Sequence, residues 1–169
     1  MVVGAKRDAA AIAAMRNATS LHLATKQGHP ERAPKVSDRG VLWSMREGHV
    51  YILRRAGKII ATLTLKPKKP WSIDRSFLTP VKRPLYLIEM AVAPEYQRRG
   101  IGRACIAAAL AIAKRWPADS LVLDADDSPT GAGPFYKKCG FTQLGRGKFR
   151  DHPLIYFEYL LTQANSSGG

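Results

Sequence analysis

The chain has 169 residues, of which 46% are hydrophobic, and its formal net charge at pH 7 is +14. This length predicts one domain, residues 1–161, with a core of its own and a flexible tail at 162–169. All apolar runs are shorter than the ~20 residues of a membrane span, and a secretory signal pattern is absent. Two cysteines give neither a disulfide framework nor metal-ligand spacing, so the sequence predicts a cytoplasmic protein without a metal.

The excess of basic residues is the outlier of the composition. A field of this sign attracts anionic partners and speeds their encounter with the protein. Nucleic acid, an acidic protein surface and a polyphosphate cofactor all fit this charge, and so does a solvated basic surface without a specific partner.

The first half of the chain predicts helices followed by a hairpin. Asp8 and Ser37 stand where helix N-caps are expected, and Gly48 stands where the second helix ends. Ala56-Gly57 separates two apolar runs, which is typical of a tight turn. The predicted elements are an edge strand at Met1–Ala5, helices from Asp8 to about Arg16 and at Asp38–Arg46, and strands at Val50–Arg54 and Lys58–Leu65.

The second half begins with a long loop, residues 66–83, which contains three prolines and six Lys or Arg. The elements predicted after it are a strand at Leu85–Val92, a helix at Arg99–Arg115, a strand at Leu121–Ala125, a short helix at Thr130–Lys138 closed by Gly140, and strands at Phe141–Leu144 and Leu154–Leu160. This order predicts a mixed α/β domain. It argues against a doubly wound dinucleotide fold, in which strand and helix alternate from the start.

An anion-binding turn is predicted between strand 85–92 and the helix that follows. A helix start leaves backbone N–H groups unpaired, glycines let a large anion approach them, and arginines add positive charge. The turn lacks the Gly-Lys-Ser/Thr ending of a P-loop and the third glycine of the dinucleotide fingerprint. It fits a pyrophosphate cradle, and a basic turn that only starts a helix is the alternative; its residues are Gln97, Arg98, Arg99, Gly100, Ile101, Gly102 and Arg103.

Three residues are candidates for proton transfer. Tyr136 could donate a proton to a leaving group, or it is an aromatic packing residue. Glu89 lies inside an apolar strand and Asp124 near the end of its strand, where either carboxylate could accept a proton from an ammonium group. Salt bridges to basic residues are the alternative for both acids. Strand alternation predicts that Leu87, Glu89 and Ala91 share one face.

Together these segments resemble the GNAT superfamily of acyl-CoA-dependent N-acyltransferases. The resemblance covers about Leu85–Phe141 and rests on Val92-Ala93-Pro94, Gln97-Arg98-Arg99-Gly100-Ile101-Gly102 and Phe135-Tyr136-Lys137-Lys138-Cys139-Gly140-Phe141, in the family's order and separation. It implies a single GNAT-like domain with a central, mostly antiparallel sheet of six or seven strands. The sheet would be splayed between strands 85–92 and 121–125 and flanked by about four helices.

The resemblance implies an N-acetyltransferase that moves an acetyl group from acetyl-CoA to a primary amine by direct attack in a ternary complex. Backbone groups of Met90, Ala91 and Val92 would bind the pantetheine arm, and the cradle residues would hold the pyrophosphate. Tyr136 would protonate the leaving thiolate, and Asp124, Glu89 or an ordered water would serve the base role. The acceptor would be a small-molecule or peptide amine, and the resemblance leaves a homodimer open.

Two positions depart from the family pattern. Pro129 stands where many members have an asparagine that helps hold the pantetheine, and Pro134 fits only if its helix begins late or is kinked. These departures motivate a second interpretation, a catalytically weak CoA-binding sensor.

A basic nucleic-acid-binding module is the interpretation from another class. It explains the charge, but an RRM-like aromatic motif, zinc spacing and an evident helix-turn-helix are all lacking in the sequence. The basic loop 66–83 predicts an acceptor that carries carboxylates or phosphates and disfavours polycationic acceptors.

Overall fold

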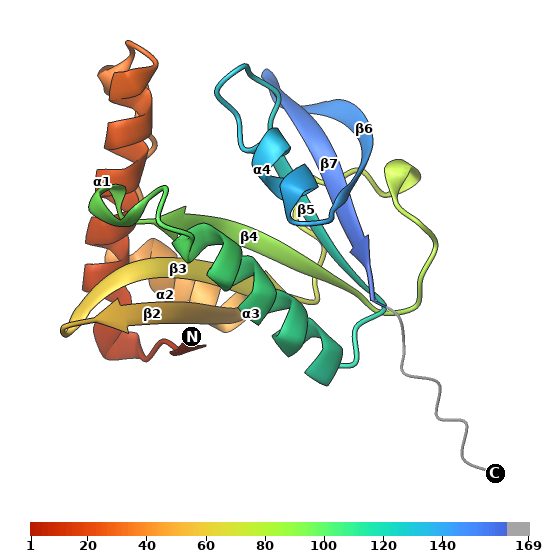
Figure 1. The fold of residues 1–169 in the computed structure, drawn as a ribbon, viewed down its shortest axis with the longest axis horizontal. Helices are drawn as coiled ribbons and strands as arrows, with labels where there is room; N and C mark the ends of the chain where they lie inside the picture. Colours follow the sequence, from red (N-terminus) through yellow and green to blue (C-terminus); the bar gives the residue numbers. More distant parts are fainter. Residues whose placement is uncertain (162–169) are drawn as a thin grey trace. The chain divides into compact units, whose positions relative to one another are not determined.

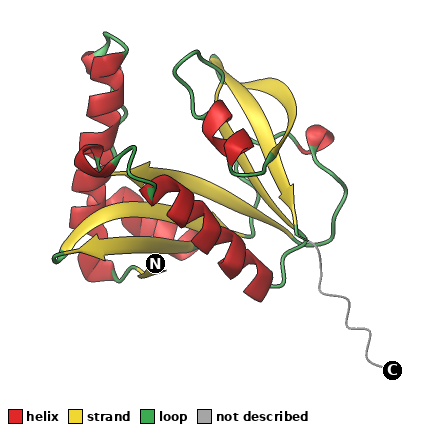
Figure 2. Ribbon diagram, viewed as in Figure 1, coloured by secondary structure: helices red, strands yellow, loops and turns green. Residues whose placement is uncertain are grey.

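The strands of the protein form one mixed sheet in the order β1-β2-β3-β4-β5-β7-β6, shown as ribbons in Figures 1 and 2. This computed structural model describes residues 1–161, and the predicted tail at 162–169 lies outside the described residues. The elements are β1 (Val2–Val3), α1 (Ala9–Lys26), α2 (Asp38–Glu47), β2 (His49–Arg55), β3 (Lys58–Lys66), β4 (Pro84–Val92), α3 (Ile101–Arg115), β5 (Ser120–Asp126), α4 (Gly133–Lys138), β6 (Thr142–Phe149) and β7 (His152–Leu160).

The fold class predicted from the sequence is confirmed. The part of the chain that the structure describes contains seven strands and four α-helices. The strand ladders β1–β2, β2–β3, β5–β7 and β6–β7 are antiparallel, whereas β4 pairs with β5 in parallel. That parallel ladder covers three residue pairs, from Pro84–Ser120 to Tyr86–Val122.

The chain forms two compact units. The first consists of Met1–Lys66 and Leu87–Ala108, and the second of Pro67–Tyr86 and the residues from Ala109 on. The single domain expected from the length of the chain therefore stays a prediction.

Local turn and cap chemistry gives the boundaries of several elements. The hydroxyl of Ser37 accepts a hydrogen bond from the N–H of Gly40 at 3.1 Å, so the predicted N-cap of α2 is confirmed. Ala56 and Gly57 have φ values of 47° and 77°, as a two-residue hairpin turn of the primed type requires. Helix α4 begins at Gly133, so Pro134 lies in its first turn, where a missing N–H costs little.

The first helix begins directly after Asp8, as predicted, but its predicted end was wrong. Helix α1 runs to Lys26 rather than Arg16, because burial of Thr19 and Ala24 stabilises a stretch of modest helix propensity. The carboxylate of Asp8 makes no cap hydrogen bond to α1. It accepts hydrogen bonds from the N–H of Ala5 at 2.9 Å and from Arg54 at 2.6 Å instead.

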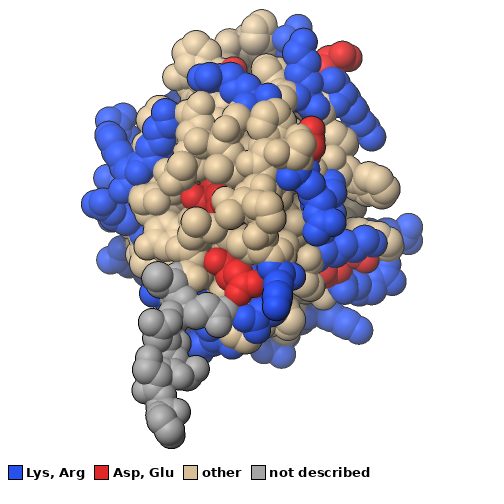
Figure 3. All heavy atoms as spheres, turned by 90° about the vertical axis from the view of Figure 1, so that its right-hand side faces the viewer, with Lys and Arg blue, Asp and Glu red and all other residues tan. Residues whose placement is uncertain are grey.

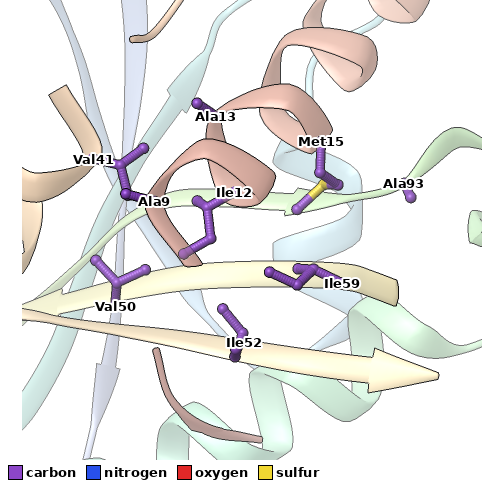
Figure 4. Close-up of a cluster of buried hydrophobic side chains, with 9 residues drawn as sticks. All are labelled: Ala9, Ile12, Ala13, Met15, Val41, Val50, Ile52, Ile59 and Ala93. Atoms are coloured by element: carbon purple, nitrogen blue, oxygen red, sulfur yellow. The ribbon is translucent and has the colours of Figure 1, made fainter. Parts of the chain in front are cut away.

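The first unit packs its helices against its strands through one aliphatic cluster. Figure 4 shows Ile12 of α1 lying over Val50 and Ile52 of β2, with Val41 of α2 beside them. Ile12 and Val41 have no exposed surface, and Val50 and Ile52 have 1% and 2%. Burying four aliphatic side chains of this size stabilises the unit by several kcal/mol, at about 1.5–3 kcal/mol each.

In the second unit, two different layers cover the two faces of β5 and β7. On one face, Tyr136 of α4 packs against Phe157, with ring centroids 5.8 Å apart. On the other face, residues 67–83, which we call the β3–β4 loop, pack Phe77 against Tyr156 at 5.3 Å. Ile73 of the same loop is 1% exposed. The sequence predicted this loop, but its proline and lysine content gave no sign that it packs on the sheet.

Glycine at position 145 leaves room for the β3–β4 loop. A Cβ atom there would meet the ring of Phe77. We expect Gly145→Ala to lower the free energy of unfolding by about 1–3 kcal/mol, because overpacking forces the ring or the strand to shift. Gly4→Ala, whose Cβ would lie 3.4 Å from Ile52, is the control with an ordinary contact.

Urea denaturation of both single variants and of Gly145→Ala combined with Phe77→Ala measures this contact. The double variant should cost less than the sum of its single changes, because the clash disappears with the ring. Strictly additive effects would contradict the contact.

Candidate active site

The turn before α3 has the geometry of an anion-binding helix start. The first hydrogen bond of α3 runs from the N–H of Ala104 to the carbonyl of Gly100 at 3.0 Å. The N–H groups of residues 101–103 therefore lie ahead of the helix's own hydrogen bonds, at the positive end of its dipole. Arg98 and Gly100 have left-handed φ values of 59° and 79°, and a Cβ on Gly100 would meet open space. This backbone fits a pyrophosphate group.

Gln97 ties this turn to the end of β4. Its amide Nε2 donates a hydrogen bond to the carbonyl of Val92 at 2.9 Å, and the hydroxyl of Thr19 contacts the same oxygen at 3.3 Å. The Gln97 side chain is therefore committed to β4. Arg99 lies 6.0 Å from the ring centroid of Tyr96.

Basic side chains also outnumber acidic ones over the wider surface. On the face drawn in Figure 3, Lys and Arg cover far more area than Asp and Glu. The whole chain has 27 Lys and Arg against 13 Asp and Glu. Such a surface attracts an anionic ligand before any specific contact forms.

Glu89 interrupts β4 with a left-handed backbone conformation. Its φ is 54°, which is rare for a residue with a side chain and marks an irregularity in the strand. The alternation predicted for Leu87, Glu89 and Ala91 is therefore broken at Glu89. Backbone strain of this kind persists only where the surroundings hold it in place.

Three side chains of the first unit hold the carboxylate of Glu89. Arg16 of α1 donates to Oε2 at 2.8 Å, Thr64 of β3 donates to Oε2 at 2.9 Å, and Ser44 of α2 donates to Oε1 at 3.0 Å. Arg16 itself is 7% exposed, and its other terminal nitrogen lies 3.2 Å from the Thr64 hydroxyl. The salt-bridge alternative for Glu89 is thus realised, with a partner that sequence spacing could not reveal.

Tyr136 lies among aromatic rings in the second unit. Its ring packs against Phe135, Phe141 and Phe157 at centroid distances of 5.2, 5.9 and 5.8 Å. Burial raises the pKa of Tyr136 to about 12, and the nearby Asp124 and Cys139 add to the shift. The phenol therefore keeps its proton at neutral pH and can act as a donor.

Asp124 faces the opposite layer of the same unit. It stands directly across from Tyr156 in the β5–β7 ladder, so both side chains leave the sheet on the side of the β3–β4 loop. Burial raises the pKa of Asp124, and hydrogen bonds from the Ser72 hydroxyl and the backbone of Asp124 offset part of that rise. Sequence reasoning missed Ser72, because nothing in a proline-rich loop indicates contact with a strand about fifty residues away.

The sequence-predicted residues divide between the two units. The first unit contains Glu89, the end of β4 at Met90, Ala91 and Val92, and the turn from Gln97 to Arg103. The second contains Tyr136 and Asp124. Within residues 1–161, no group of three or more His, Cys, Asp or Glu is placed to hold a metal ion. No helix in the same range is both long and apolar enough to cross a membrane.

Comparison with known proteins gives a match to one protein family. The sequence model described as the acetyltransferase (GNAT) family matches residues 11–141. Glucosamine 6-phosphate N-acetyltransferase of Schizosaccharomyces pombe is 29% identical over 99 residues, which are 57% of this chain and 81% of that protein. N-acetyltransferase family 8 member 3 of Rattus norvegicus is 26% identical over 120 residues, which are 68% of this chain; the match spans only half, 50%, of the rat protein.

Solved structures share the fold at low sequence identity. The ribosomal-protein-S18-alanine N-acetyltransferase of Escherichia coli has a TM-score of 0.72 at 17% identity, with 99% of this chain and 96% of that chain covered. The protein yncA of Salmonella typhimurium, solved with acetyl-CoA, has a TM-score of 0.69 at 18% identity, with 97% and 94% covered. At these identities, the likeness concerns the fold alone.

Replacing Glu89 should destabilise the fold, because the buried guanidinium of Arg16 then lacks a charged partner. We expect Glu89→Ala to lower the free energy of unfolding by about 2–3 kcal/mol, because the guanidinium loses its charged partner. The carboxylate is 34% exposed, so water reaches part of the pair and moderates the loss. Urea denaturation measures the effect, and Glu95→Ala, at an exposed acid of the same unit, is the control.

A paired replacement separates lost charge balance from lost packing. Arg16→Met combined with Glu89→Leu should be more stable than Glu89→Ala alone, because no unpaired charge stays buried. Equal stability of Glu89→Ala and Glu95→Ala would show that the ion pair contributes nothing.

Proposed function

The chain belongs to the GNAT acetyltransferase family, and we propose that it transfers an acetyl group from acetyl-CoA to a primary amine. The observation that carries the proposal is the turn at the start of α3. Its backbone N–H groups lie ahead of the helix's hydrogen bonds, and its two left-handed residues lie beside the arginines. A polyphosphate with one long arm is the ligand class that this turn and the adjoining strand β4 fit.

Donor binding is assigned to the first unit. The N–H groups of residues 101–103 would hold the pyrophosphate, with charge from Arg98, Arg99 and Arg103. Backbone groups at Met90 and Ala91, past the irregularity at Glu89, would bind the pantetheine arm as an added strand does. The carbonyl of Val92 is already occupied by Gln97 and Thr19, so only its N–H is assigned to the donor.

Proton transfer is assigned to Asp124 and Tyr136. Bound acetyl-CoA supplies the thioester that an amine attacks. An amine must first lose a proton, and the raised pKa of Asp124 makes its carboxylate a better acceptor than an ordinary surface acid. Tyr136 keeps its proton at neutral pH and would donate to the leaving sulfur. Asp124 and Tyr136 lie on opposite faces of β5 and β7.

Glu89 is the weaker candidate for the base. Its two carboxylate oxygens already accept hydrogen bonds from Arg16, Thr64 and Ser44. Taking up a proton would break a charge-assisted pair with a buried guanidinium, which costs several kcal/mol. We therefore assign Glu89 the role of holding the left-handed turn of β4.

The acceptor is proposed to be a primary amine that also carries negative charge. The support is the net charge of +14 and the basic β3–β4 loop, whose exposed residues belong to the same unit as Asp124. Two relatives point to different amines, because their names state glucosamine 6-phosphate and an alanine of ribosomal protein S18. Only the first carries a phosphate.

One of the two sequence departures that suggested a catalytically weak CoA-binding sensor has a structural explanation. Pro134 fits the first turn of α4 without a kink, because the helix begins one residue earlier at Gly133. Pro129 remains as the single departure that motivates a protein that binds CoA without turnover.

Ligand binding and an amine panel test the proposal. Acetyl-CoA at 100 times its dissociation constant should add about 2.7 kcal/mol of stability in a thermal-shift assay. Thiol release should then rise with amines that carry a phosphate or carboxylate, such as glucosamine 6-phosphate or an alanine-terminated acidic peptide. If millimolar acetyl-CoA gives no thermal shift, the proposed function is wrong. If thiol release is fastest with polyamines or lysine-rich peptides, the proposal that the acceptor amine carries negative charge is wrong. A thermal shift without amine-stimulated thiol release would favour the sensor.

Two variants test the proton-transfer roles. Tyr136→Phe and Asp124→Asn should each lower kcat by roughly 100-fold or more, with acetyl-CoA binding retained. Tyr159→Phe and Asp126→Asn, which make the same chemical changes at a tyrosine of β7 and an exposed acid of β5, are the controls. If Glu89→Gln lowers kcat and Asp124→Asn does not, the base is Glu89.

Asp124→Asn should also raise stability at neutral pH. The folded-state pKa of Asp124 lies above its ordinary value of 3.8, so its contribution to stability is fully present below pH 3.8 and lost as pH rises through the raised pKa. Asparagine removes that loss. The melting temperature of the variant should therefore exceed the wild-type value at about pH 7.5 and converge with it near pH 4.

A further inference from the structure

We propose that Ser72 is a positioning residue through which the β3–β4 loop holds the Asp124 carboxylate, so that this loop controls the base of the reaction. The inference rests on the proposed function, in which Asp124 accepts the proton of the amine. It adds a residue that neither the family signature nor the comparisons assign.

The β3–β4 loop is held firmly enough to position another residue. Lys69 donates hydrogen bonds to the carbonyls of Pro70 and Ile73 at 3.0 and 2.7 Å, which closes the segment around Ser72. Ile73 is buried with Tyr86, Val122 and Tyr156 in one apolar cluster. Ser72 is thus enclosed on both sides by residues with fixed contacts.

Tyr156 connects this segment to the strand of Asp124. Its hydroxyl donates a hydrogen bond to the carbonyl of Ser72 at 3.0 Å. In the β5–β7 ladder, Tyr156 lies directly opposite Asp124. Tyr156 therefore holds the backbone of Ser72 on the face of the sheet from which the Asp124 side chain leaves. The Ser72 hydroxyl opposes the rise that burial causes in the pKa of Asp124, as a hydrogen bond to the carboxylate does.

Asp124 shares its face of the sheet with Tyr156 and with Glu158 of β7, which is 3% exposed. Tyr156 of β7 and Tyr136 of α4 both have a raised pKa through burial, so they stay neutral. Asp74 of the loop has a lowered pKa, because the backbone N–H and hydroxyl of Ser76 bind its carboxylate, so it stays ionised. A hydrogen bond from Ser72 stabilises the charged form of Asp124, and its loss favours the protonated form.

Five variants of the full chain test the inference. Ser72→Ala removes the donor, Ser72→Thr retains a hydroxyl, and Tyr156→Phe removes the anchor of the Ser72 carbonyl. Ser120→Ala is the matched control for the serine change, because its hydroxyl lies on the same strand as Asp124 and has no partner within residues 1–161. Tyr159→Phe is the control for the tyrosine change, on the same strand but the opposite face.

The measurement is kcat/KM against pH, with acetyl-CoA binding followed in parallel. In Ser72→Ala, the acid limb should move to higher pH, so that kcat/KM at the acid end falls roughly tenfold while the alkaline plateau changes little. Ser72→Thr should restore the limb, Tyr156→Phe should move it in the same direction as Ser72→Ala, and both controls should leave it in place. An equal loss at every pH, or an acid limb that does not move, would overturn the inference.

A second readout keeps this test separate from the proposed function. The carbon chemical shift of the Asp124 carboxyl, followed by NMR against pH, reports its protonation without turnover. If wild type shows no acetyl transfer, the proposed function fails, and the Asp124 titration in Ser72→Ala still decides whether Ser72 holds the carboxylate. An unchanged titration midpoint in that variant would refute the inference whatever the activity.

Discussion

A buried arginine needs acceptors for its charge, and Arg16 finds them on two strands, β3 and β4. Its guanidinium binds Glu89 of β4 and lies within 3.2–3.4 Å of the hydroxyls of Thr62 and Thr64 of β3. Glu89 in turn accepts from Ser44 of α2. This single network joins α1 and α2 to β3 and β4 at the point where β4 adopts a left-handed conformation. Since an unpaired charge in this place would be costly, the network specifies which backbone arrangement of β4 is stable. The strand then continues to Val92, whose carbonyl fixes the anion-binding turn through Gln97.

The second unit separates its chemistry by the two-residue period of a strand. Neighbouring residues of β7 point to opposite faces, so Phe157 meets Tyr136 of α4 while Tyr156 meets the β3–β4 loop. The same period places Asp124 on the loop side. In the proposed function, the proton donor Tyr136 of α4 and the proton acceptor Asp124 of β5 therefore lie on opposite faces of this pair of strands. Their environments differ accordingly, because aromatic rings surround the phenol and a serine hydroxyl binds the carboxylate.

Sequence reasoning succeeded where structure is decided locally. The N-cap at Ser37, the turn at Ala56-Gly57 and the glycine-rich start of α3 depend on backbone conformations that a few neighbouring residues dictate. It failed where tertiary contacts decide. Ten residues of α1 were missed; two of them, Thr19 and Ala24, are buried, and such tertiary contacts are not visible in local helix propensity. The partners of Glu89 and Asp124 could not be found either, since Arg16 and Ser72 lie 73 and 52 residues away in a chain with 27 basic residues to choose from.

In the proposed function, the donor and acceptor sites draw on different kinds of groups in the chain. The proposed donor contacts would use backbone groups at β4 and at the start of α3, which require particular φ values and few particular side chains. The proposed acceptor side would use side chains of the β3–β4 loop, and that loop contacts the sheet through Ile73 and Phe77. A substitution in the loop can therefore alter the surface offered to an amine and the environment of Asp124 at the same time. In the proposed mechanism, acceptor choice and base strength are then properties of one segment, which can diverge without disturbing the binding of acetyl-CoA.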